Sequence, residues 1–374
     1  MPFKGGSLNT GRMSRSSLKF VQSNGLLEGC KLGGYNKRVT LRDIAEKTGF
    51  SANTVSLALR NSDKLTPATG KAIRKAAADL NYFPNLVAQS LVSSQSWTIG
   101  LVLTDIMNPI LTEVAQAIGA ALHDKGYSIL FATSSSNAER EAEVINTFRS
   151  RQVDGLLVFP VNHSDMSYLA KLRAGGFPVV SLVNDPTGET DCVALDEKVG
   201  VSIATKHLID VGHRKIAFLD AASGLQNTSK RAGYRQALDA AGISGSEELE
   251  EQVVGHGIEA GYKAFARLWD RGVRPTAVMV TRDATALGIM RWCHDFGISV
   301  PDQLSIVGFD NTEQAKMANV PLTSVNFPVG RISAAAVDHL LSLVESKGEL
   351  PAAAQHLFKP ELVVRKSTCP PTEG

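Results

Sequence analysis

The stretch from Thr40 to Leu59, which reads TLRDIAEKTGFSANTVSLAL, constrains the fold of this chain more than any other part of it. Apolar side chains recur at helical spacing on both sides of Gly49, so the pattern predicts two short helices that cross at a tight turn. Thr40 can cap the first helix, with Asp43 as the acid of a capping box. Gly49 can end that helix because glycine enters the left-handed region at little cost, and Ser51 can cap the second helix.

The spacing of Ala45, Gly49 and Val55 is typical of a helix-turn-helix, whose second helix enters the major groove of DNA. By itself this spacing also fits any small pair of antiparallel helices. A third helix is predicted to begin at Pro67, because a capping hydroxyl precedes proline at the first helical position. Residues 38–83 are therefore predicted to form an all-α domain of three helices.

From Trp97 onward, apolar runs alternate with amphipathic helical segments. The apolar runs predict buried parallel strands, and they are TIGLVL, YSILFA, GLLVF, PVVSLV, KIAFLD, TAVMV and LSIVGF. Amphipathic helices are predicted between them, for example over residues 109–125, 197–211 and 284–296. This alternation predicts a doubly wound α/β body with right-handed crossovers. At about 270 residues, the body suits two such sheets better than one.

Charge is distributed unevenly along the 374 residues. Residues 1–96 contain 14 Lys and Arg against 5 Asp and Glu, a net charge of +9, which leaves −7 for the remainder. A basic N-terminal part joined to an acidic body fits a module that meets phosphates, attached to one that does not. Residues 1–37 are predicted to be a disordered basic tail. The alternatives are an over-extended gene start, with Met13 as initiator, and a basic arm that adds nonspecific DNA affinity.

The four cysteines lie far apart and form no metal-ligand or redox pair, and no cluster of histidines shows metal spacing, so we expect no metal. No cofactor is expected either. They are Cys30, Cys192, Cys293 and Cys369. A reducing cytoplasm is the simplest setting for them. No apolar run approaches the roughly 18 residues that a membrane span needs, and LLEGC at residues 26–30 lacks the preceding apolar region of an export signal. We therefore expect a cytoplasmic protein that makes no contact with a membrane.

Six segments closely resemble the LacI family of bacterial transcription regulators and occur in the family's order. They are VTLRDIAEKTGFSANTVSLALRN, LNYFPN, GHRKIAFL, VPDQLSIVGFD, PLTSV and PELVVRKST. The resemblance runs from Arg38 to Thr368 and implies two doubly wound, parallel-sheet subdomains of periplasmic-binding-protein type, joined by crossover strands near residues 195, 325 and 354. The implied N-terminal subdomain comprises residues 97–195 and 325–353, and the implied C-terminal subdomain comprises residues 196–324 and 354–374. A ligand would bind in the cleft between them, at the carboxyl ends of the strands.

The resemblance also implies that Ala52, Asn53 and Leu57 lie where this family reads bases. The Asn53 amide can pair bidentately with adenine, Ala52 can touch a thymine methyl, and Leu57 offers only van der Waals contact. Further residues assigned to DNA contact are Thr40, Asn61 and three whose hydroxyls suit phosphates, Ser51, Thr54 and Ser56. The alternative role of such hydroxyls is helix capping.

Residues 84–96 are predicted to be a hinge helix and linker. Pro84 stops the third helix, and the segment LVAQSLV after it is too short to persist as a helix alone in water, so it is expected to fold only on DNA. Leu91 matches the lever leucine of the family, which relatives press into the minor groove; without the resemblance it would be taken for core. Gln89 stands where relatives often have Arg, which puts one phosphate contact in doubt. The hinge residues assigned to DNA are Asn85, Ala88, Gln89 and Leu91.

The effector pocket implied by the resemblance departs from the family's pattern. Ile110 and Leu111 stand where aromatics often stack on a ligand. Lys230 replaces a common ligand-clamping Arg, His256 replaces a stacking aromatic, and Arg282 sits where Asn is usual. The residues assigned to effector binding are Asn108, Ile110, Leu111, Phe159, Lys230, His256, Arg282, Asp283 and Asp310.

Three potentially cationic groups that face one cleft favour an anionic effector, such as a sugar acid or a phosphorylated sugar. Two alternatives remain for Lys230 and Arg282. They are surface charges, or they pair with Asp283 and Asp310 and leave a site for a neutral sugar.

The leading hypothesis is a sequence-specific DNA-binding transcription regulator, a repressor in the nucleoid, whose operator affinity a small sugar-like effector controls. A homodimer would bind a pseudo-palindromic operator, because symmetry doubles a short half-site; a tetramer is left open. We expect no enzyme, since the sequence has no GxGxxG after a strand, no GxxxxGK[ST] and no GxSxG. The alternative is a sugar-binding protein of periplasmic type without DNA function, which the lack of a signal peptide and the presence of residues 40–91 disfavour.

Overall fold

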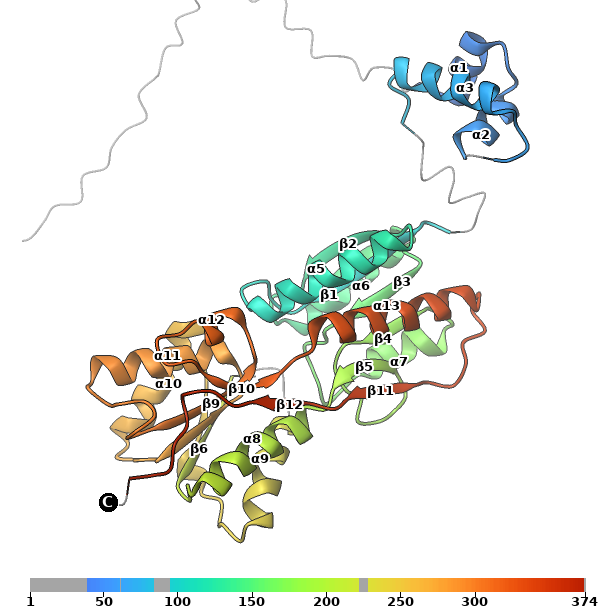
Figure 1. Ribbon diagram of the computed structural model, residues 1–374. Helices are drawn as coiled ribbons and strands as arrows, with labels where there is room; N and C mark the ends of the chain where they lie inside the picture. Colours follow the sequence, from blue (N-terminus) through green and yellow to red (C-terminus); the bar gives the residue numbers. More distant parts are fainter. Residues whose placement is uncertain (1–38, 61, 84–94, 222–227, 373–374) are drawn as a thin grey trace, which may run out of the picture. The chain divides into compact units, whose positions relative to one another are not determined.

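The computed structural model describes residues 39–60, 62–83, 95–221 and 228–372 (Figure 1). These residues form two compact units, a small one within residues 39–83 and a large one within residues 95–372. We call them the head and the body. No helix of the described residues is long and apolar enough to cross a bilayer.

The head is a bundle of three helices around a small apolar core. Its helices are α1 (Leu41–Thr48), α2 (Ala52–Leu59) and α3 (Pro67–Asp79). Fully or nearly fully buried side chains from all three meet in the core, and these are Ile44, Val55, Ala58, Ile73, Ala76 and Ala77. The Arg74 guanidinium donates to the Ala58 carbonyl at 3.2 Å, so α3 also holds the carboxyl end of α2.

The caps predicted for the head are present. The Asp43 carboxylate accepts the Thr40 backbone N–H at 2.6 Å, and the Ser51 hydroxyl accepts the Thr54 backbone N–H at 3.1 Å. Gly49 ends α1 with a φ of 73°, in the left-handed region that glycine enters freely. These local interactions set the turn between α1 and α2 and therefore the direction of α2.

The body contains two six-stranded sheets. The N-terminal sheet has the strand order β11 (Gln355–Phe358), β5 (Asp191–Leu195), β4 (Val179–Ser181), β3 (Gly155–Val158), β1 (Thr98–Leu103) and β2 (Ser128–Thr133). The C-terminal sheet has the order β12 (Glu361–Val363), β10 (Thr323–Asn326), β9 (Ser305–Asp310), β8 (Ala277–Val280), β6 (Ile216–Asp220) and β7 (Glu250–Gln252). Only β12 runs antiparallel to its neighbour among the paired strands of the described residues. Each of the seven predicted apolar runs overlaps one of these strands, and the predicted fold class is confirmed.

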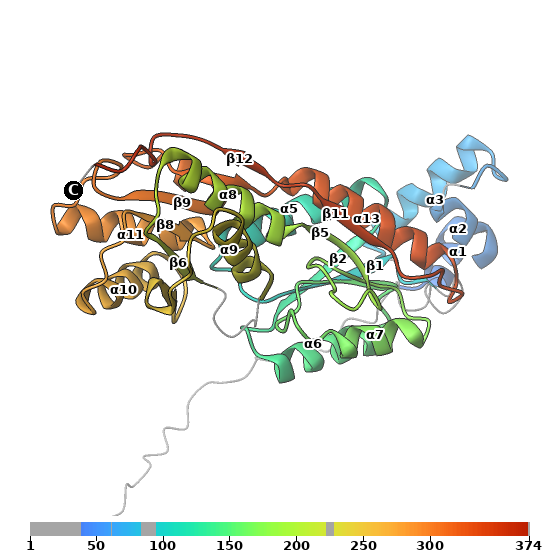
Figure 2. The same cartoon turned by 90° about the horizontal axis from the view of Figure 1, so that it is seen from below.

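Helices cover both faces of each sheet (Figure 2). The N-terminal sheet packs against α5 (Pro109–Asp124) and α13 (Val329–Glu345) on one face and α6 (Ala138–Ser150) and α7 (Ser167–Ala174) on the other. The C-terminal sheet packs against α8 (Glu197–Val211) and α9 (Thr228–Ala240) on one face and α10 (Gly257–Asp270) and α11 (Asp283–Asp295) on the other. The remaining short helices are η1 (Glu247–Leu249) and α12 (Glu313–Lys316).

The chain passes between the two sheets three times, after β5, after β10 and after β11. The third passage lies at residues 359–360 rather than near residue 354 as expected. The reason is that β11 pairs with β5 of the N-terminal sheet, from Gln355 beside Cys192 to Phe358 beside Leu195. Residues 354–358 therefore belong with the N-terminal sheet.

Glycine allows α8 and α9 to cross at close range. A Cβ atom at Gly233 of α9 would lie 2.2 Å from the carbonyl oxygen of Lys198 in α8, which is backbone and cannot rotate away. This crossing brings the start of α9 beside the start of α8, where two charged side chains described below meet.

We expect the substitution Gly233→Ala to lower the free energy of unfolding by about 2–3 kcal/mol, because the added methyl must push two helices apart. The matched control is Gly330→Ala in α13, where the added Cβ meets nothing within 4 Å. That control should be neutral or slightly stabilising, since alanine favours helix. Chemical denaturation of both variants measures the difference, and equal stability of the two would contradict the close crossing.

Candidate functional site

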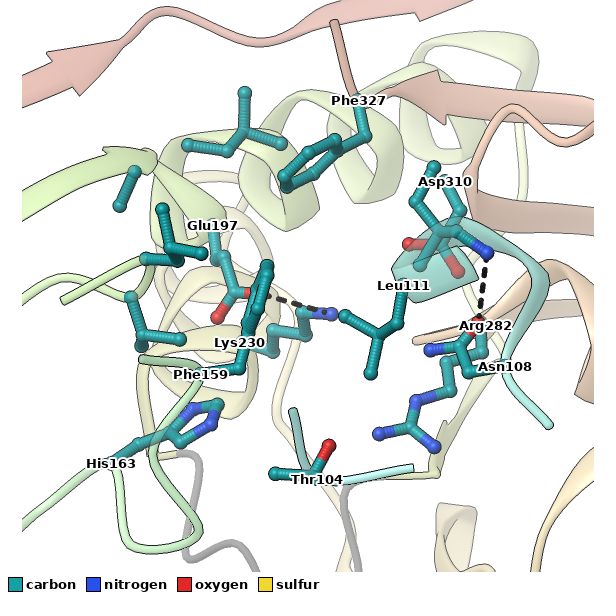
Figure 3. Close-up of a pocket in the computed structure, with 15 residues that line it drawn as sticks. Thr104, Asn108, Leu111, Phe159, His163, Glu197, Lys230, Arg282, Asp310 and Phe327 are labelled. Atoms are coloured by element: carbon teal, nitrogen blue, oxygen red, sulfur yellow. Dashed lines mark hydrogen bonds and ion pairs between the residues drawn. The ribbon is translucent and has the colours of Figure 1, made fainter. Parts of the chain in front are cut away.

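A cavity of about 70 Å³ is lined by residues from both sheets of the body (Figure 3). Thr104 follows β1 and Phe159 follows β3 in the N-terminal sheet, whereas Arg282 follows β8 and Asp310 ends β9 in the C-terminal sheet. Parallel strands place their carboxyl ends at one edge, so the topology itself gathers these side chains. The lining residues are Thr104, Asn108, Ile110, Leu111, Phe159, His163, Leu182, Val183, Ala194, Leu195, Glu197, Lys230, Arg282, Asp310 and Phe327.

Seven of the nine residues assigned to the effector pocket line this cavity, and they are Asn108, Ile110, Leu111, Phe159, Lys230, Arg282 and Asp310. The structure does not bring His256 and Asp283 to its wall. His256 precedes α10, with its Nδ1 3.8 Å from the Asp105 carboxylate and about half of its side chain exposed. Glu197 and His163 line the cavity although the sequence did not point to them.

Asp283 is fully buried and does not line the cavity, because its carboxylate is bonded to Thr312 before α12 and to Ser324 in β10. Its carboxylate accepts the Thr312 backbone N–H at 2.8 Å and the Ser324 hydroxyl at 2.7 Å. Burial raises the pKa of this carboxyl, while the bonds from Ser324 and Thr312 oppose the rise. Asp283 therefore connects the start of α11 to the segment that follows β9. Asp310 is the last residue of β9.

The charge of Lys230 is compensated inside the protein. Its Nζ lies 3.1 Å from the Glu197 carboxylate, donates to the Thr281 carbonyl at 3.2 Å, and stands 3.9 Å from the centre of the Phe309 ring. An ammonium buried to this degree needs such partners, because desolvation disfavours an isolated charge. Glu197 pairs with Lys230, whereas one of the alternatives from the sequence paired Lys230 and Arg282 with Asp283 and Asp310.

Arg282 and His163 offer polar groups that the protein leaves available. Arg282 makes no ion pair with any residue that the structure describes, and it lies where β8 turns into α11. His163 Nδ1 is buried without a hydrogen-bond partner among the described residues. Burial lowers the pKa of His163, so its imidazole is neutral near pH 7. The cavity therefore presents a guanidinium and a neutral imidazole to whatever occupies it.

The backbone is strained at one wall of the cavity. Asp310 and the following Asn311 have φ values of 111° and 58°, which cost on the order of 1–3 kcal/mol for each non-glycine residue. Bonds from distant segments hold them there: the Asn311 N–H donates to the Ser324 hydroxyl at 3.0 Å, and its side-chain amide donates to Asn326 at 2.8 Å. Burial raises the pKa of the Asp310 carboxyl, against the influence of Lys230. Such imposed strain is characteristic of ligand-binding walls.

The second candidate site is the outer surface of α2 in the head. Ala52 and Asn53 are exposed, as are Thr40 and Ser51, whereas Leu57 is half-buried. Ser56 and Thr54 are also half-buried, and the Thr54 and Ser51 hydroxyls are hydrogen-bonded to each other at 2.8 Å. The remaining DNA assignments, Asn61, Asn85, Ala88, Gln89 and Leu91, lie outside the described residues, as does the predicted tail over residues 1–37.

The head and the body each match a known protein family. Residues 40–85 match the family described as bacterial regulatory proteins, lacI family, and residues 205–368 match a periplasmic binding protein-like domain. The HTH-type transcriptional regulator DegA of Bacillus subtilis (strain 168) is 31% identical over 339 residues, which are 89% of this chain and 99% of that protein.

Solved structures of regulators of this kind are also similar to this chain. The Lac repressor dimer bound to operator and the anti-inducer ONPF is similar with a TM-score of 0.80 and 28% identity, over 89% of this chain and 100% of that one. The complex of the transcriptional regulator CelR with cellobiose is similar with a TM-score of 0.63 and 28% identity, over 88% of this chain and 100% of that one.

Glu141 holds a loop that forms part of the cavity wall. Its carboxylate is buried and accepts the Val161 backbone N–H at 2.7 Å, in the loop that carries Phe159 and His163. Burial raises the pKa of the Glu141 carboxyl from its ordinary 4.5 to about 7, although the bond from Val161 opposes the rise.

A carboxyl with a raised pKa binds its proton more tightly in the folded state, so its contribution to stability is full at low pH and is lost as the pH rises through about 7. We expect Glu141→Gln, whose amide oxygen can still accept from Val161, to escape this loss. The variant should gain about 2 kcal/mol over wild type between about pH 5 and pH 8. Melting temperatures across that range test this, with the exposed Glu139→Gln on the same helix as control. A constant difference across the range would show that Glu141 does not titrate as stated.

Proposed function

We propose, given that this chain belongs to the lacI family of bacterial regulatory proteins, that it is a repressor whose affinity for an operator is controlled by a small anionic sugar derivative bound in the body. The chain is a DNA-binding transcriptional regulator, since its relatives over nine-tenths of its length are such regulators.

The exposed amide of Asn53 supports base reading by α2. Asn53 and Ala52 lie in the first turn of α2 with their side chains exposed, and the recognition helix of a helix-turn-helix contacts base edges with its N-terminal residues. The head also distinguishes this protein from a periplasmic-type sugar-binding protein, which has the body alone. We therefore propose that the protein acts on DNA, in association with the nucleoid, rather than as a sugar-binding protein alone.

The observation that carries the effector proposal is that Arg282 makes no ion pair with the described residues, whereas Lys230 is already paired with Glu197. A planar guanidinium matches a carboxylate or phosphate bidentately. The cavity has a volume of about 70 Å³, and one enclosed water needs about 10–15 Å³ of cavity volume. The cavity therefore holds about five waters, which suits a monosaccharide derivative. The bound cellobiose of the similar regulator CelR supports a sugar-like effector.

A homodimer is supported by the apolar surface of the body. The edge strand β2 exposes Ile129 and Phe131, and an uncovered apolar edge strand invites pairing or packing. The loop after β1 exposes Met107 by 77%, and the segment after α12 exposes Met317 by 76%. We propose that a second copy covers the exposed side chains of β2, as a dimer is the form of the similar Lac repressor on its operator.

The Asn53 assignment predicts a change in sequence preference. In duplexes selected by the wild-type protein from a random library, Asn53→Ala should lose about 1–3 kcal/mol of discrimination at one position of each half-site. Thr54→Val serves as comparison, because loss of a phosphate contact should weaken binding to all duplexes by a similar factor. If Asn53→Ala also weakened all duplexes equally, Asn53 would be a phosphate contact and not a base reader.

The effector assignment predicts a preference for acids. In isothermal titration, gluconate-type acids and sugar phosphates should bind more tightly than their neutral parent sugars, and Arg282→Gln should remove about 1.5–3 kcal/mol of that preference. Arg291→Gln is the matched control, since Arg291 lies in α11, the helix that Arg282 precedes, and pairs with Asp295 at the surface. Tighter binding of the neutral sugars to the wild-type protein would defeat the anionic proposal.

A further inference from the structure

A carboxylate holds the segment that leads into the body. Asp154 lies just before β3, and its Oδ1 accepts the Ser96 backbone N–H at 2.7 Å and the Ser96 hydroxyl at 3.0 Å. Its Oδ2 accepts the Trp97 backbone N–H at 2.7 Å. One side chain therefore fixes two successive peptide groups of a segment 57 and 58 residues earlier in the sequence. We call this arrangement the Asp154 latch.

Other contacts reinforce the latch. The Trp97 carbonyl accepts the Ser128 N–H at 2.8 Å, which ties the segment to the start of β2. Gln95 donates to the Tyr127 hydroxyl at 2.6 Å, and the Trp97 ring lies 5.2 Å from the Tyr127 ring. The segment is thus attached to the starts of β1, β2 and β3.

The latch imposes a conformation that the segment would not adopt by itself. Trp97 has a φ of 55°, which a bulky side chain rarely adopts, and about half of its side chain is exposed. Pairing of β1 with β3 begins only at Ile99 and Gly155, so the bonds to Ser96 and Trp97 lie outside the sheet. They fix the direction in which the chain leaves the sheet rather than the sheet itself.

The latch and the cavity lie at opposite ends of the same two strands. Trp97 precedes β1 and Thr104 follows it, while Asp154 precedes β3 and Phe159 follows it. Thr104 and Phe159 line the cavity, and β1 and β3 are neighbours in the N-terminal sheet. A paired strand is stiff along its length, so a displacement of its carboxyl end by a ligand also displaces its amino end.

We propose that Asp154 is a positioning residue of this regulator: it makes the segment at residues 95–97 move with the N-terminal sheet, so that ligand binding in the cavity reaches the linker and the head. The inference rests on the proposed function. Asp154 touches neither DNA nor ligand in this account. It acts through its bonds to Ser96 and Trp97, which make residues 95–97 follow any displacement of β1 and β3.

The test compares full-length Asp154→Asn with wild type on two probes, a duplex selected by the wild-type protein and a random-sequence duplex of equal length. An amide has one oxygen in place of two acceptors, so it cannot hold both N–H groups. The ratio of the two affinities should fall by about tenfold or more, the size of effect expected for charge-assisted bonds, while affinity for the random duplex changes little. Asp239→Asn, which removes the same charge from an exposed site on α9, should leave the ratio unchanged.

Two further variants separate positioning from stability. Ser96→Ala removes the hydroxyl bond to Asp154 and the bond that this hydroxyl accepts from the Thr98 N–H, but it keeps both backbone bonds to Asp154. It should lower the ratio in the same direction by a smaller factor, which keeps the test open if Asp154→Asn does not fold. Leu268→Ala removes core contacts of α10 away from the cavity, so it destabilises the body elsewhere and should leave the ratio intact. An unchanged ratio in Asp154→Asn, or in Ser96→Ala where Asp154→Asn does not fold, would overturn the latch. By contrast, a wild-type protein without any sequence preference would overturn the proposed function itself.

Discussion

A parallel strand buried on both faces can display polar side chains only at its ends, and the rest of this structure depends on that constraint. β1 is apolar and buried along almost its whole length, and β3 is buried throughout. Helices on both faces of the sheet leave no lateral surface for a ligand. The residues that follow these strands therefore form the cavity wall, and those that precede them meet the segment leading to the linker.

Burial then decides which charges in the cavity remain available. Lys230 is satisfied by Glu197, by a carbonyl and by an aromatic face, because a buried ammonium without partners would cost several kcal/mol. Arg282 has no such partner among the described residues, so a ligand anion can satisfy it without breaking an existing pair. The difference between these two cations, which look equivalent in the sequence, comes from the crossing of α8 and α9 that places Glu197 beside Lys230.

Features that depend on residues three or four apart were predictable, and those that depend on distant segments were not. The caps at Thr40 and Ser51 and the turn at Gly49 follow from local hydrogen bonds, and long apolar runs predicted seven strands correctly. β11 is short and largely exposed, so only its pairing with β5 identifies it as a strand, and the third passage was placed too early. Likewise Glu197 meets Lys230, which lies 33 residues later in the sequence, and Asp283 is bonded to Thr312 and Ser324. No local pattern reveals these contacts.

Because both sheets contribute to the cavity wall, the strength of ligand bonds depends on how the sheets are placed relative to each other. A ligand shifts a conformational equilibrium only by its difference in affinity for the two states, and a full reversal from 1:99 to 99:1 needs about 5.5 kcal/mol. A molecule that contacted Arg282 alone would bind both states equally, since that residue moves with the C-terminal sheet. A molecule that also bonded His163 or Asn108, which belong with the N-terminal sheet, would favour one separation of the sheets. A ligand that acts as an effector should therefore contact residues of both sheets. A ligand that contacts only one sheet should occupy the cavity without changing the affinity for DNA.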